Sequence, residues 1–220
     1  MALQIGLGLD GKLRVRIQKT DGTCVYADGM SRLPSGVFVA VFSRWFTVLK
    51  ELEEMINSPR ISEGDLQKFF EAYPELLTAD EYDRIVPQAR IMREDGDSDW
   101  VADFVLHPFD QTKFCKILEL KVPRILTSRT PKTGHARFYT NLLDAIRQLR
   151  DYGKAFHSPA TRRTFREKYK IDVFLPDLHL VVGRKWDLMH MKAMHELQRD
   201  NVISIDDWDT LLARLRRQFI

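Results

Sequence analysis

Three ionisable side chains, Asp103, Glu119 and Lys121, stand within two apolar segments that a short polar turn separates. The first segment is VADFVLHPF and the second is KFCKILELKVP. Both have the length and the β-branched and aromatic content of strands, so the sequence predicts a β-hairpin. Because side chains alternate between the faces of a strand, Glu119 and Lys121 share a face, and Asp103 projects from the same side of the neighbouring strand.

Charged groups in such an apolar setting must pair with one another or bind a charged ligand, because burying each one unpaired costs several kcal/mol. Two carboxylates on neighbouring strands can supply oxygen ligands to Mg²⁺ or Mn²⁺. Lys121 would then orient or deprotonate a water that attacks a phosphate group. The alternative is a structural salt bridge of Glu119 with Lys121 or Asp103, since E-x-K is a common tripeptide.

Two helices are predicted beside this hairpin. Ser62 is a good N-cap for the segment EGDLQKFFEAYPELL, and Glu63 falls in its first turn, where interaction with the helix dipole is the ordinary explanation of a glutamate. After the hairpin, a second helix is expected from about residue 137 to residue 156. Gln148 and Tyr152 are four positions apart in it and therefore lie on one helical face.

The order of these pieces resembles the PD-(D/E)XK nuclease superfamily. A D-x-V strand, a turn, a strand ending in E-L-K-x-P, a preceding helix with Glu63 and a following Q-x-x-x-Y element all match its pattern. Within the superfamily, the sequence is most similar to the catalytic domain of Shedu anti-phage defence proteins. The similarity covers about residues 60–215, through the segments EGDLQKFFEAYPELL, ADFVL, ILELKVP, DAIRQLRDY and PDLHLVVGR and, more loosely, IDDWDTLLAR.

The resemblance implies an α/β fold with a PD-(D/E)XK nuclease-like core, in which helices flank a mixed central β-sheet. It also implies a divalent-metal-dependent DNA endonuclease of prokaryotic anti-phage defence, with Mg²⁺ or Mn²⁺ as cofactor. Ala102 stands where the superfamily's name has proline, a replacement that many of its branches tolerate. Six residues receive roles from the resemblance: Asp103 and Glu119 as metal ligands, Lys121 as the catalytic lysine, Glu63 as an auxiliary acidic residue near the metal, Gln148 as a hydrogen-bonding residue that shapes the site, and Tyr152 as its support.

Two basic stretches offer contacts for a nucleic acid. The polar segment that follows Lys121 is expected to be a loop, and its cations are placed to bracket a phosphate backbone at the mouth of the site. The stretch TRRTFREKYK would extend this surface. An ordinary solvated loop is the alternative for each stretch. The candidate nucleic-acid-binding residues are Arg124, Arg129, Lys132 and Arg137.

The first part of the chain predicts a small β element. KLRVRIQ and TCVYA alternate around the turn signal Asp21-Gly22, and GVFVAVF is expected to form a third, more buried strand. A helix is predicted from Arg44 to Asn57. These features divide the chain into a β-rich N-terminal extension with a linker helix, residues 1–59, and a nuclease-like domain, residues 60–220. In the simplest interpretation, the extension is a packing or oligomerisation module. In the other interpretation, it restrains the activity of the nuclease domain.

The composition is that of a soluble globular protein, with 44% apolar and 30% charged residues. The 34 basic and 31 acidic residues leave +3, which is too weak to indicate a nucleic-acid partner by itself. Cys24 and Cys115 form neither a metal-binding pair nor a disulfide framework. With no leader pattern and no run near ~18 apolar residues, a cytoplasmic protein without membrane contact is expected.

We further expect DNA as the partner and a homo-oligomer as the assembly. The alternative function is a nuclease-fold DNA-binding or assembly module without catalytic activity.

Overall fold

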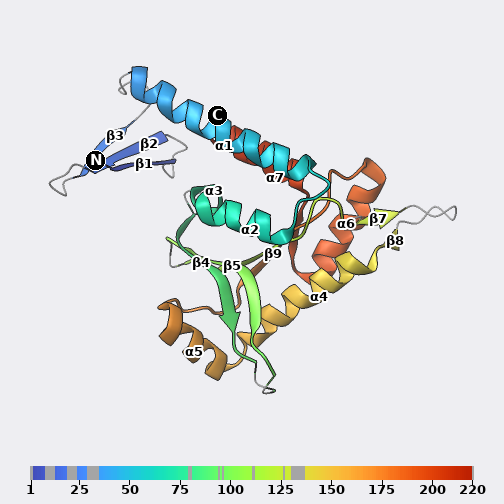
Figure 1. Ribbon diagram of the computed structural model, residues 1–220. Coiled ribbons are helices and arrows are strands. Elements are labelled where there is room, and N and C mark those ends of the chain that lie inside the picture. Colours follow the sequence, from blue (N-terminus) through green and yellow to red (C-terminus); the bar gives the residue numbers. More distant parts are fainter. Residues whose placement is uncertain are drawn as a thin grey trace.

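A five-stranded mixed sheet, with strand order β10-β9-β6-β5-β4, forms the centre of the computed structural model (Figure 1). The structure describes residues 2–7, 13–18, 24–28, 35–78, 81–93, 95, 97–110, 112–125, 127–129 and 137–219. The antiparallel pairs are β4 with β5 and β5 with β6, whereas β6 with β9 and β9 with β10 are parallel. The strands are β4, Tyr82–Ile91; β5, Trp100–Pro108; β6, Lys116–Leu120; β9, Asp177–Val181; and β10, Ser204–Asp206.

Helices cover both faces of this sheet (Figure 1). The α/β class and the mixed sheet flanked by helices are therefore confirmed. In the described part of the chain, no helix is both long enough and apolar enough to cross a membrane. One face carries α1, Ser35–Asn57; α2, Glu63–Ala72; α3, Glu75–Thr78; and α7, Trp208–Phe219; the other carries α4, Thr140–Ala155; α5, Pro159–Tyr169; and α6, Leu188–Asn201.

Alternate residues of the β5/β6 hairpin supply two separate hydrophobic cores. Phe104 and Leu118 pack with the helices α1, α2 and α7, in a core whose largest side chains include Trp45 and Trp208. This assignment of one strand residue to one core follows from the two-residue period of a strand. The buried residues of α1 thus share a core with those of α2, although the boundary at residue 59 remains a prediction.

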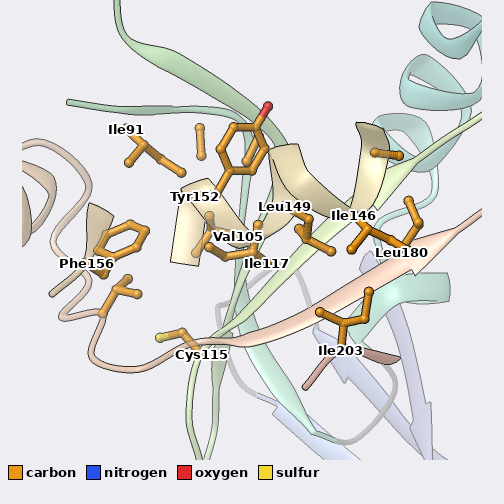
Figure 2. Close-up of a cluster of buried hydrophobic side chains, with 14 of the residues drawn as sticks. Ile91, Val105, Cys115, Ile117, Ile146, Leu149, Tyr152, Phe156, Leu180 and Ile203 are labelled. Carbon is orange, nitrogen blue, oxygen red and sulfur yellow. The ribbon is translucent and has the colours of Figure 1, made fainter. Parts of the chain in front are cut away.

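The second core lies between the opposite face of the sheet and α4. Val105 and Ile117 from the hairpin meet Leu149, Tyr152 and Phe156, as Figure 2 shows. All five side chains are fully buried or nearly so. The predicted alternation therefore holds from Phe104 to Leu106, but it is wrong at Ala102, which lies in the same core as Val105, so the alternation breaks at Asp103.

Helix α2 begins where the sequence predicts. The Ser62 hydroxyl accepts the Asp65 N–H at 3.2 Å, and the Asp65 carboxylate accepts the Ser62 N–H at 3.1 Å, which together form a capping box. Helix α4 begins later than predicted, because Arg137 and Phe138 form the short strand β8. That strand pairs with β7, Ser128–Arg129.

The N-terminal region contains a three-stranded antiparallel sheet, β1, Ala2–Leu7, β2, Leu13–Gln18, and β3, Cys24–Asp28. The pairing of β2 with β3 is confirmed, whereas its turn, Asp21-Gly22, lies outside the described residues. The third strand predicted at GVFVAVF is wrong, because these residues belong to α1. A continuous apolar run does not distinguish a buried strand from a helix. Extending an existing helix also avoids the cost of a new nucleus.

Candidate active site

The β5/β6 hairpin opens at Asp103 and Glu119. Its paired register runs from Leu106 opposite Lys116 to Phe104 opposite Leu118, so Asp103 and Glu119 are the next two positions. Beyond that pair, the Asp103 carboxylate accepts the Leu120 N–H, with 2.7 Å between Oδ2 and nitrogen. A side chain therefore replaces a backbone acceptor where the strands separate. The two carboxyl groups are close enough for the charge of Glu119 to raise the pKa of Asp103.

Lys121 lies between two carboxylates. Its Nζ is 2.8 Å from Glu119 Oε1 and 3.4 Å from Glu63 Oε2. The backbone of Lys121 is held on both sides, since its N–H donates to the Val181 carbonyl at 2.8 Å and its carbonyl accepts the Trp208 Nε1–H at 2.7 Å. These contacts bring Glu63 of α2 to the end of β6, so α2 and the β5/β6 hairpin meet at Lys121.

The Asp103 and Glu119 carboxyl groups hold protons more strongly than usual. Burial raises the pKa of Asp103 to about 7, and the charge of Glu119 adds to that rise. Burial also raises the pKa of Glu119, although Lys121 opposes it. For Lys121, burial alone would lower the pKa, but the nearby carboxylates of Glu119 and Glu63 outweigh burial and raise it. The cluster is therefore short of positive charge.

One oxygen of Glu119 is left without a donor. The residue is 2% exposed, and its Oε2 is buried with no hydrogen-bond partner in the described part of the chain, while Oε1 accepts a hydrogen bond from Lys121. A buried acceptor without a partner costs about 1–3 kcal/mol. The predicted alternative, a salt bridge between Glu119 and Lys121, is present, yet it satisfies only half of this carboxylate.

The donor set suits a magnesium-like ion better than a transition metal. Mg²⁺ is often held by one or two carboxylates, with water and phosphate oxygens completing its shell. Asp103 and Glu119 provide such a pair. Within the described ranges, no three His, Cys, Asp or Glu side chains converge as a complete metal-binding group. Glu63 meets Glu119 through the ammonium of Lys121 and contacts the lysine in this geometry.

Gln148 and Tyr152 of α4 hold the β5 backbone. The Tyr152 hydroxyl donates to the Val101 carbonyl at 2.9 Å, and Gln148 Nε2 donates to the same hydroxyl. Burial raises the pKa of Tyr152, and the charges of Glu119 and Asp103 add to the rise. Figure 2 shows the Tyr152 ring among the apolar side chains, with its hydroxyl at the edge of that group. Gln148 thus acts through Tyr152.

Sequence reasoning missed Gln67. This residue of α2 is 5% exposed, and its Nε2 donates to the Asp103 carbonyl at 3.1 Å and to Glu71 Oε1 at 2.9 Å. Its position four residues after Glu63 places both on one helical face. A polar residue beside the apolar stripe of a helix was the available signal.

The first basic stretch is only partly described. Arg124 Nη1 donates to the Ile61 carbonyl at 2.7 Å and to the Pro59 carbonyl at 3.3 Å, which ties this residue to the segment before α2. Arg129 and Arg137 are opposite one another in the β7/β8 pair. Their side chains, and the whole of Lys132, lie outside the described residues.

The second basic stretch forms α5. Arg162, Arg163 and Arg166 line a cavity of about 250 Å³ together with Pro159 and Asp172. Arg166 is 3.6 Å from the Asp172 carboxylate, which offsets part of this charge. The cavity therefore presents guanidinium groups at the outer side of β4, against which α5 packs through Thr161 and the Met92 carbonyl.

Comparison with known proteins gives one match. Residues 60–212 match the model of a protein family described as Shedu protein SduA, C-terminal. A search of curated proteins and a search of solved structures each found no match. The matched segment begins just before α2 and ends within α7, so it contains the hairpin and every candidate catalytic residue.

Proposed function

The chain belongs, over residues 60–212, to the family of the Shedu protein SduA C-terminal domain, and from this premise we propose a divalent-metal-dependent DNA endonuclease of prokaryotic anti-phage defence. In this proposal the sheet and its helices are a PD-(D/E)XK nuclease core in a cytoplasmic protein. The observation that carries it is the pair of half-buried Asp103 and buried Glu119, whose pKa values are raised and whose Glu119 Oε2 has no donor among the described residues. Strongly perturbed carboxyl groups of this kind are typical of functional sites.

Asp103 and Glu119 would hold Mg²⁺ or Mn²⁺, which supplies Lewis-acid polarisation of a phosphate oxygen and a more acidic bound water. Hydrolysis adds the oxygen of water to phosphorus and releases the ester oxygen as an alcohol. Lys121 would orient or deprotonate that water and offset charge growing on the phosphate oxygens.

The DNA backbone would be held by the basic stretches that flank the site. A guanidinium has five N–H donors, so Arg124 keeps free donors beyond the Nη1 group that binds the backbone. The β7/β8 segment with Arg129, Lys132 and Arg137 would complete the path, and the arginines of α5 would extend it. DNA as substrate and homo-oligomeric assembly are both parts of the proposal.

The test is cleavage of supercoiled plasmid, linear duplex and single-stranded circular DNA with Mg²⁺ or Mn²⁺. The wild type is compared with Glu119→Ala and Lys121→Ala, and with the matched controls Glu54→Ala and Lys50→Ala, an exposed ion pair on α1. Loss of a group acting on the reacting atoms is expected to reduce cleavage about 100-fold or more. The controls should cut like the wild type.

Equal cleavage by the wild type and both site variants, on all three substrates, would overturn the nuclease assignment. DNA binding that is equally tight in all proteins, without cleavage, would select the alternative of a nuclease-fold binding or assembly module. Both results are readable from one set of gels and titrations.

A further inference from the structure

Two carbonyl groups of β5 near the site accept hydrogen bonds from helix side chains. The pairing of β5 with β6 ends at Phe104 opposite Leu118, whereas the pairing of β5 with β4 continues to Trp100 opposite Ile91. A buried carbonyl still requires a donor. The Val101 carbonyl receives the Tyr152 hydroxyl at 2.9 Å, and the Asp103 carbonyl receives Gln67 Nε2 at 3.1 Å.

The two donors come from helices on opposite faces of the sheet. Tyr152 belongs to α4 and to the core on one side, whereas Gln67 belongs to α2, whose apolar residues pack in the other core. Side chains from both layers therefore hold the separated end of β5, one on either side of Ala102.

The orientation of the Gln67 amide follows from its neighbours. The Asp103 carbonyl and the Glu71 carboxylate can only accept hydrogen bonds when Glu71 is ionised, so the amide nitrogen must face both of them. A flipped amide would bring an oxygen against two oxygens. Gln67 is thus fixed as the donor to Asp103, and its own Oε1 is buried without a partner among the residues that the structure describes.

We propose that Gln67 is a positioning residue of the site. By holding the Asp103 carbonyl, it fixes the peptide from which the Asp103 carboxylate reaches the Leu120 N–H, and it thereby keeps that carboxylate opposite Glu119. Gln67 acts through Asp103 and needs no contact with the substrate. Its effect on catalysis rests on the proposed nuclease function, whereas its effect on the Asp103 carboxylate does not.

The direct test is amide hydrogen exchange of metal-free protein by NMR. Gln67→Leu keeps a similar volume and removes the donor, and Glu71→Gln is the matched control because it leaves the bond from Gln67 to Asp103. We expect Leu120 to lose protection about tenfold in Gln67→Leu, as for a lost outer-shell partner, while the Ile117 amide, in the intact part of the hairpin, changes little.

Unchanged protection of Leu120 in Gln67→Leu would overturn the proposal. A uniform loss of protection along β6 would also overturn it, because Gln67 would then serve the stability of the fold alone. Glu71→Gln should match the wild type at both amides, and a loss at Leu120 in that control would assign the effect to Glu71.

A second measurement separates this proposal from the nuclease proposal. With DNA as substrate, Gln67→Leu is expected to lower kcat about 10- to 100-fold with little change in KM, and to weaken Mn²⁺ binding by about tenfold. If the wild type cuts no DNA, the nuclease proposal fails and the exchange of Leu120 still decides the role of Gln67. If the wild type cuts DNA and Gln67→Leu cuts equally well, only the role of Gln67 fails.

Discussion

The central sheet carries two partly buried acidic clusters that differ in how many positively charged partners each carboxylate has. At one end, Asp206 Oδ2 lies 2.8 Å from both His179 Nε2 and Arg214 Nη2. Burial alone would raise the pKa of Asp206, but the hydrogen bond and charge of His179, with Arg214, outweigh burial and lower it. For Asp103 the balance is reversed. Burial raises its pKa by more than the hydrogen bond from Leu120 and the charge of Lys121 lower it.

The number of partners explains the difference. One carboxylate meets two nitrogen groups at Asp206, whereas the three carboxyl groups of Asp103, Glu119 and Glu63 share the ammonium of Lys121. In the first cluster, His179 and Arg214 bind the Asp206 carboxylate, and these contacts link β9 and α7 to β10. The second retains an excess of negative charge, which is the property that a divalent cation would neutralise.

The largest expected contrast is in metal binding. Asp103→Asn should abolish the calorimetric signal of Mn²⁺ at pH 8, well beyond the about 10- to 100-fold effect of losing an outer-shell partner, because a charged ligand is removed. Asp206→Asn, a matched change in the satisfied cluster, should bind Mn²⁺ like the wild type. Retained binding in Asp103→Asn would show that the unsatisfied cluster is not a metal site.

The two clusters should also give opposite pH dependences of the free energy of unfolding, measured with urea from about pH 2 to about pH 8 without metal. Asp103 has an ordinary pKa of 3.8 and a folded pKa of about 7, so the folded state binds more protons between these values. Stability should therefore fall by a few kcal/mol as pH rises through this window, and Asp103→Asn should remove the fall.

Asp206 has the reverse sign, since its folded pKa is lowered. Its contribution is present above its ordinary pKa of 3.8 and is lost as pH falls through the folded value. A metal-free wild type that gains stability from pH 4 to pH 7, with Asp103→Asn behaving identically, would contradict the assignment of excess negative charge to the hairpin.

The smallest effect is expected from Arg214→Ala. The Arg214 side chain is 51% exposed and His179 remains on Asp206, so the loss of unfolding free energy at pH 7 should be about 1 kcal/mol or less. Urea unfolding measures it, and plasmid cleavage should not change. A loss much larger than this would mean that the satisfied cluster depends on each of its cations separately.

Local patterns predicted the elements that hold the site better than they predicted its contacts. The alternation of the hairpin predicted that Phe104 and Val105 enter different cores, and Ser62 marked the start of α2, because both features depend on residues only a few positions apart. Gln67 could not be found in this way, since it meets Asp103 36 positions away. No periodicity in either segment encodes that meeting.

The first half of α1 and the strand β1 escaped prediction for a different reason. An apolar run such as GVFVAVF fits both secondary structures, and the choice between them depends on the neighbouring residues of the chain. Likewise, β8 took the residues predicted to begin α4, because they pair with β7. In each case the outcome depends on an interaction beyond the segment itself.

The hydrogen bond from Trp208 to the Lys121 carbonyl has a consequence for biosynthesis. The tryptophan comes 87 positions after the lysine, so a chain emerging from the ribosome exposes Asp103, Glu119 and Lys121 long before α7 exists to anchor the lysine. The acidic hairpin is made first and its anchor much later. During translation, the order of synthesis itself delays assembly of the site.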